Sequence, residues 1–113
     1  MYNKSGRIST VNSESKQKRI AYGYYRDIDD RIRIHEHYAA YVKLIFIYRS
    51  YGESLGSIKK KLETVGVLSP QGGKAWSCQT LQNILSNPHY MGDDDYPQII
   101  TPEQFKEVQI IHG

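Results

Sequence analysis

The longest amphipathic pattern in the chain spans residues 35–51. Its apolar positions recur every three or four residues, which is the spacing of one face of an α-helix. These positions are Ala39, Val42, Ile45 and Phe46, widened by Tyr38, Tyr41 and Tyr48. Gly52 follows the last of them and favours the left-handed conformation in which many helices end. We therefore predict one long helix over this segment.

Two shorter helices are predicted next, each with a serine at its N-terminal cap. Ser54 precedes the first of them, and Gly66 ends it. Ser77 precedes the second, and Pro88 prevents it from continuing. The apolar stripe of the first is Leu55, Ile58, Leu62 and Val65, and that of the second is Leu81, Ile84 and Leu85. These two helices, packed on the long helix before them, form the pattern of a helix-turn-helix.

The segments around these helices are less regular. Residues 1–19 are mostly polar and basic, and we expect them to be a flexible leader. Residues 20–34 favour a short hairpin or extended strand, with a turn at their aspartates. Residues 67–76 are rich in proline and glycine and are expected to be an irregular connection.

The C-terminal part is expected to add a short turn or wing and a final helix. Residues 90–100 have strand-like residues on both sides of three consecutive aspartates. Thr101, Pro102 and Glu103 then open a helix that runs through Phe105, Val108 and Ile111. The predicted fold is mainly α: a winged helix-turn-helix-like bundle with a short N-terminal hairpin and a short wing, as one domain over residues 20–113.

Composition limits the possible classes of protein. A chain of 113 residues with 39% hydrophobic residues is sized for one ordinary core, and it has no apolar run long enough for a bilayer. Cys78 is the only cysteine, so a disulfide within the chain and a four-cysteine zinc site are excluded. No secretion signal is recognisable, and we expect a cytoplasmic protein.

The net charge of +3 is unevenly distributed. Of the 15 Lys and Arg residues, all but Lys106 lie in residues 1–76. The later part is acidic and holds Asp93, Asp94, Asp95, Glu103 and Glu107. A surface that faces phosphates is therefore expected mainly on the earlier part, and wing contact with phosphates is disfavoured.

The second short helix carries side chains suited to reading DNA bases. Opposite its apolar stripe lie Gln79, Gln82 and Asn83, spaced so that they share one face. Their amides offer a donor and an acceptor together and can pair with an adenine edge, and the hydroxyl of Thr80 can reach a base as well. The alternative is an ordinary solvated helix face.

Basic and hydroxyl side chains nearby are candidates for contact with phosphates. Lys59, Lys60 and Lys61 form a run on the first short helix, which would lie across the sugar-phosphate backbone. Further candidates are Ser77, Lys74, Lys18 and Arg19. The alternative is that these lysines only make the surface soluble. We expect no catalytic residue, no metal site, no cofactor and no small-molecule substrate, because neither the histidines nor the aspartates have ligand spacing and no tyrosine is beside an activating group.

Taken in order, these residues resemble the recombinase domain of the large serine recombinase family, a part of the resolvase and invertase proteins. The resemblance covers roughly residues 20–109. It is carried by Tyr22-Gly23-Tyr24, Ala39, Val42, Ile45-Phe46, Gly52, Ser54, Ile58, Leu62, Gly66, Pro70, Gly73, Trp76-Ser77, Thr80, Ile84-Leu85, Asn87-Pro88, Tyr90, Gly92, Pro97, Ile100 and Phe105.

The resemblance implies a domain that binds a double-stranded DNA attachment site. It also implies a parent protein that acts as a dimer or tetramer on DNA during integration or excision of a mobile element, with cutting by a separate serine-bearing domain that we expect this chain to lack. Two other functions stay open on the residues: a stand-alone winged-helix transcriptional regulator, and a protein interaction module that uses the C-terminal third.

Overall fold

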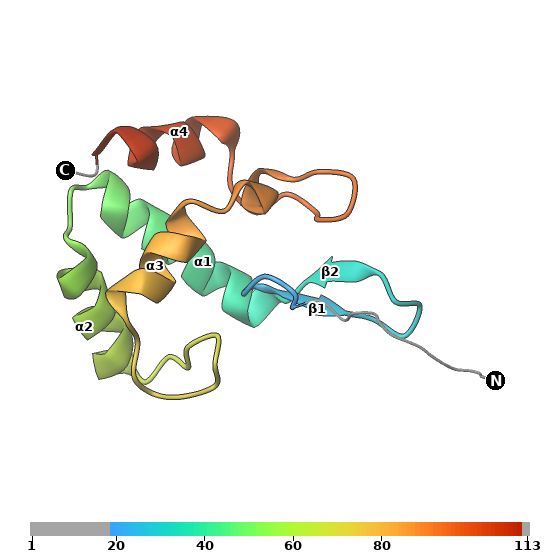
Figure 1. The fold of residues 1–113 in the computed structure, drawn as a ribbon, viewed down its shortest axis with the longest axis horizontal. Coiled ribbons are helices and arrows are strands. Elements are labelled where there is room, and N and C mark those ends of the chain that lie inside the picture. The colour runs from blue at the N-terminus through green and yellow to red at the C-terminus, as the bar shows by residue number, and fades with distance from the viewer. Residues whose placement is uncertain (1–18, 112–113) are drawn as a thin grey trace.

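The computed structural model describes residues 19–111, and within them the fold is mainly helical with a short hairpin, as predicted (Figure 1). The elements are β1 (Tyr24–Arg26), β2 (Ile32–Ile34), α1 (Glu36–Ser50), α2 (Leu55–Val65), α3 (Cys78–Leu85), the 3-10 helix η2 (Pro88–Met91) and α4 (Pro102–Ile111). The expected leader, apart from Arg19, lies outside the described residues, as does the side chain of Ile111. None of the described helices is long and apolar enough to cross a bilayer.

The predicted hairpin is an antiparallel pair in which Tyr24 pairs with Ile34 and Tyr25 with Arg33. Side chains alternate between the two faces of a strand, so Tyr24 is buried against the helices while Tyr25 is exposed. The turn is held by Asp27, whose carboxylate accepts hydrogen bonds from backbone N–H groups of the turn and from the guanidinium of Arg33. That guanidinium is the main reason why the pKa of Asp27 is lowered.

Helix α1 runs through the centre of the molecule and contacts α2, α3 and α4 (Figure 1). Its predicted apolar face is buried, with Val42 and Ile45 fully inaccessible to solvent. Gly23 allows the hairpin to approach this helix closely. Its φ is +99°, and a Cβ at this position would lie 2.9 Å from Cγ2 of Val42.

Both short helices begin at the predicted caps. The Ser54 hydroxyl accepts from the N–H of Ser57, and the Ser77 hydroxyl accepts from the N–H of Thr80. Helix α2 ends at Gly66 in the left-handed conformation. Val65 departs from the prediction: it is 73% exposed, because the last residue of α2 lies beyond the edge of the packed stripe.

The connection between α2 and α3 is irregular, as predicted, but it is closed by a buried tryptophan. The indole N–H of Trp76 donates to the carbonyl of Val67 at 2.8 Å, so the two ends of the loop lie side by side. Inside the loop, Ser69 is buried and its N–H donates to the carbonyl of Gly73. The loop is therefore anchored to the core at both ends.

The segment that was expected to be a short turn or wing contains no β-strand among the described residues. Helix η2 comes first and buries Tyr90, which is 1% exposed. A turn follows, in which the carboxylate of Asp93 accepts from the N–H groups of Asp95 and Tyr96. The aspartates therefore lie in a turn, because the side chain of Asp93 bonds to the backbone two and three residues ahead.

The apolar side of α3 is the part of the core on which its placement depends. We predict that Leu81→Ala, at a position that is 0% exposed, lowers the free energy of unfolding by about 2–5 kcal/mol, because the truncation leaves a cavity between helices. Urea denaturation followed by circular dichroism measures the change. Val65→Ala is the control, with an expected change within about 0.5 kcal/mol. Equal losses in the two variants would contradict the prediction.

Candidate nucleic-acid interface

Helix α3 has only eight residues, and side chains from outside the helix hold both of its ends. At the N-terminal end, the backbone N–H of Trp76 donates to Oε2 of Glu63 on α2 at 2.7 Å. At the C-terminal end, Nε2 of Gln109 on α4 donates to the carbonyl of Leu85 at 2.6 Å. Because a helix this short is unstable alone, these bonds and the buried side together determine its orientation.

The predicted base-reading residues lie on the side of α3 that faces away from the core. Gln79 and Asn83 are exposed, and Gln82 and Thr80 are half-buried. Nε2 of Gln79 donates to Oδ1 of Asn83 at 2.9 Å. This bond leaves an acceptor on Gln79 and a donor on Asn83, which is the combination that an adenine edge requires.

The hydroxyl groups at the start of α3 are joined to each other. Oγ of Ser77 donates to Oγ1 of Thr80 at 2.9 Å and also accepts from the N–H of Thr80. Both side chains therefore stabilise the first turn of the helix. Ser77 is exposed, so its hydroxyl remains accessible from outside the protein.

The three lysines of the run on α2 differ in their ion pairs. Lys59 pairs with Glu63 at 3.3 Å, and Lys61 pairs with Glu53 at 2.6 Å. Lys61 also lies over the ring of Tyr48. Lys60 is exposed and forms no ion pair within the part of the chain that the structure describes. It is therefore the lysine of this run whose charge is least compensated.

The other predicted phosphate contacts lie in separate places. Lys74 is exposed on the loop that leads into α3, and Arg19 is exposed at the start of the described chain. Neither forms an ion pair among residues 19–111. Lys18 lies outside the described residues.

A network of tyrosine hydroxyls joins the hairpin to the segments around α3. Tyr22 donates to the carbonyl of Leu68, Tyr24 to that of Pro97, and Tyr90 to that of Tyr22. Burial is the main reason why the pKa values of these three hydroxyls are raised, so they remain neutral donors. The network supports the fold and offers no activated nucleophile.

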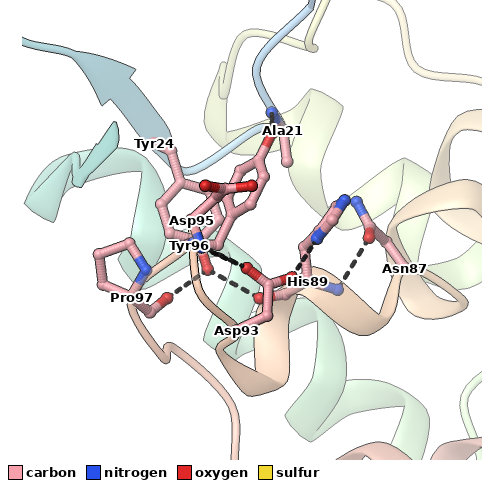
Figure 2. Close-up of polar contacts among 8 residues, drawn as sticks. All are labelled: Ala21, Tyr24, Asn87, His89, Asp93, Asp95, Tyr96 and Pro97. Carbon is pink, nitrogen blue, oxygen red and sulfur yellow. Dashed lines mark hydrogen bonds and ion pairs between the residues drawn. The ribbon is translucent and has the colours of Figure 1, made fainter. Parts of the chain in front are cut away.

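His89 and the loop that follows η2 form a second cluster (Figure 2). Nδ1 of His89 bonds to Oδ2 of Asp93, and the imidazole stacks on the ring of Tyr96. The bond to His89 is the main cause of the lowered pKa of Asp93, and backbone N–H groups add to it. All three aspartates are exposed, but both carboxylate oxygens of Asp93 have hydrogen-bond partners.

Sequence reasoning missed the anchors of α3 and this cluster. One local signal could have indicated Trp76: it stands immediately before the cap Ser77, and Leu81 stands four residues after the cap, which is the spacing of a hydrophobic staple. No local pattern indicates Glu63 or Gln109, because their partners are 13 and 24 residues away.

The described residues contain no group of three or more His, Cys, Asp or Glu side chains that could hold a metal ion. The features present are a short, externally anchored helix with exposed amides, and exposed cations on the neighbouring helix and loop. Together they define a small helical domain of the kind that binds DNA.

Comparison with known proteins identifies the family. The family model described as Recombinase matches residues 36–111. The chain therefore belongs to the Recombinase family. The two solved structures described next agree with the resemblance of its sequence to the recombinase domain of the large serine recombinases. A comparison with curated proteins finds no match.

Two solved structures are similar to this chain. One is the crystal structure of a large serine recombinase (LSR) in complex with DNA, with 28% sequence identity and a TM-score of 0.64 over 86% of this chain. The other is described under the sequence requirements of the Listeria innocua prophage attP site, with 27% identity and a TM-score of 0.66 over 86% of this chain. The chain spans 33% and 43% of the lengths of these two relatives.

The bond between Glu63 and the start of α3 gives a pH-dependent prediction. The N–H of Trp76 first, and then Lys59, lower the pKa of Glu63 in the folded protein. A lowered pKa stabilises the fold above the unfolded value of about 4.3, and this contribution is lost as the pH falls through the folded value. We predict that Glu63→Gln, which keeps the acceptor and removes the charge, lowers the melting temperature at pH 7.

The difference in melting temperature between the wild type and Glu63→Gln is expected to become smaller as the pH falls below about 4. Thermal melts between pH 3 and pH 7 measure it. Thr64→Ala, at an exposed position beside Glu63, is the control and is expected to give a pH-independent difference. A Glu63→Gln difference that stays constant over this range would contradict the role of the charge.

Proposed function

We propose that this chain binds double-stranded DNA sequence-specifically, as the non-catalytic, DNA-binding domain of a serine site-specific recombinase that integrates or excises a mobile element. In this proposal α3 enters the major groove, and Gln79, Thr80, Gln82 and Asn83 contact base edges. Cutting and strand exchange are carried out elsewhere in a longer protein, which acts as a dimer on one site and a tetramer on two.

The observation that carries the proposal is the exposed amide pair on α3. Gln79 and Asn83 lie one helical turn apart on a helix whose other side is buried, so the side facing outward is fixed by the core. A major groove about 12 Å wide accepts one α-helix, and adjacent amides on it can address neighbouring base pairs. Membership of the Recombinase family and the likeness to a recombinase bound to DNA add support.

Contact with phosphates is proposed for the cations next to α3. Lys60 on α2 and Lys74 on the preceding loop are exposed and lack ion pairs among the described residues, so binding to phosphates does not require them to leave a carboxylate. Lys59 and Lys61 would have to exchange their glutamates for phosphates. Ser77, Arg19 and Lys18 complete the proposed set.

Removal of one base contact should reduce the discrimination between DNA sequences more than it reduces the affinity for DNA in general. We predict that Asn83→Ala weakens binding to a duplex selected from a random pool by about 1–3 kcal/mol and leaves binding to a scrambled duplex nearly unchanged, because only base contacts distinguish the two. Fluorescence anisotropy at fixed salt measures both affinities. Gln98→Ala, which removes an exposed amide outside α3, is the control. Equal affinity of the wild type for the two duplexes would contradict sequence-specific binding.

Removal of one phosphate contact should affect all duplexes alike. We predict that Lys60→Ala lowers affinity for selected and scrambled duplexes equally and reduces the slope of log affinity against log salt by about 1. A salt series in the same assay measures the slope. Lys106→Ala removes the same charge from an exposed position on α4 and is expected to leave the slope unchanged. Identical slopes for the two variants would show that Lys60 does not contact phosphates.

A further inference from the structure

Two grooves share Arg19, His89 and Tyr96 in their linings, and they differ in their carboxylates. The first, which we call the acidic groove, lies between the hairpin and the loop after η2, and is lined by Asp30, Asp93, Asp94 and Asp95 together with Arg19, Arg26 and Arg31. The second, which we call the α3 groove, runs beside α3 and has no carboxylate among its lining residues. Because four carboxylates line the first groove beside three arginines, while the second has Arg19 and no carboxylate, the second groove is the more favourable one for a polyanion.

Hydrogen-bonding side chains and the cation Arg19 line the α3 groove. The polar lining includes Thr80 and Asn83 of α3, Asn87 and His89 after it, and Gln71 and Arg19 from elsewhere in the chain. Oδ1 of Asn87 is occupied, because it accepts from the N–H of His89 at 3.0 Å (Figure 2). The amide NH₂ of Asn87 has no protein partner among the described residues and is available to a ligand.

The groove is continuous with the proposed base-reading surface, because Thr80 and Asn83 belong to both. A helix that lies in the major groove has one sugar-phosphate strand on each side of it. On one side of α3 the proposed phosphate contacts come from α2 and its lysines. The α3 groove lies beside the same helix, and the polar part of its lining consists of neutral amides, hydroxyls, an imidazole and Arg19, which are side chains that contact phosphates without reading sequence.

We propose that the α3 groove holds a sugar-phosphate strand of the duplex, with Gln71, Asn87 and His89 as contacts to its phosphates. This inference rests on the proposed function and extends it to residues beyond the base-reading set. His89 lies at the boundary between the two grooves, and its bond to Asp93 holds the imidazole in place. Asp94 and Asp95 line the acidic groove and not the α3 groove, so the α3 groove is the more favourable path for the strand.

Replacing an amide side chain of the α3 groove by the carboxylate of the same size tests the proposed phosphate contact with little change in the shape of the groove. Asn87→Asp keeps an oxygen that accepts from the N–H of His89, so the cap of η2 is preserved, and it adds one negative charge to the groove wall. We expect affinity for selected and scrambled duplexes to fall together, by about fivefold to tenfold at low salt, because one repulsive contact near 4 Å in water is of that size. Gln71→Glu, on an exposed part of the loop, is expected to act in the same direction.

Gln104→Glu on α4 is the matched control. Oε1 of Gln104 accepts from the N–H of Thr101 at the start of α4, and a glutamate keeps this bond while adding the same charge outside the groove. We expect less than a twofold change in affinity for either duplex. Thermal melts of all three variants verify that each is folded.

The outcomes separate the groove from the proposed function. If the wild type discriminates the selected duplex and both Asn87→Asp and Gln71→Glu bind like Gln104→Glu, the groove proposal is overturned while the proposed function stands. The same holds if the groove variants lose discrimination and keep their affinity for scrambled duplex, since the groove would then contact bases. If the wild type binds no duplex at low salt, both proposals fail.

Discussion

The structure depends on the burial of one side of an eight-residue helix. Leu81, Ile84 and Leu85 are at most 5% exposed, and their contacts with the surrounding helices supply the stability that α3 cannot supply for itself. Since side chains on opposite sides of a helix are fixed relative to each other, burial of this side determines where the amides point. The presentation of Gln79 and Asn83 is thus a consequence of the core.

Ion pairs between neighbouring side chains determine where positive charge remains uncompensated, and the net charge of the chain does not. The hairpin carries several arginines, but Arg33 pairs with Asp27 and Arg26 pairs with Asp30, so little net charge remains on it. Part of the positive charge that lacks an ion pair among the described residues, at Lys60 and Lys74, lies on the helix and the loop that precede α3. A net charge of +3 would not have located it.

Local signals predicted the helices well, because caps and apolar spacing act within one or two turns. Ser54, Gly66 and Ser77 have the predicted roles at helix ends. Exposure of Val65 was not predicted, since periodicity does not reveal where a neighbouring helix stops. The candidate site was predictable as a set of polar residues, whereas the anchor from Glu63 to the start of α3 was not. It depends on how two helices cross, and no local pattern in the sequence encodes that crossing.

The tyrosine network has a consequence for how such a domain can diverge. Tyr22, Tyr24 and Tyr90 all donate to main-chain carbonyls, and every residue type possesses a carbonyl. The side chains of Leu68 and Pro97, which accept through their carbonyls, can therefore change without loss of these bonds. Descendants of this chain can diversify the loops at residues 68 and 97, and with them the surfaces they present, while three phenols keep the scaffold unchanged.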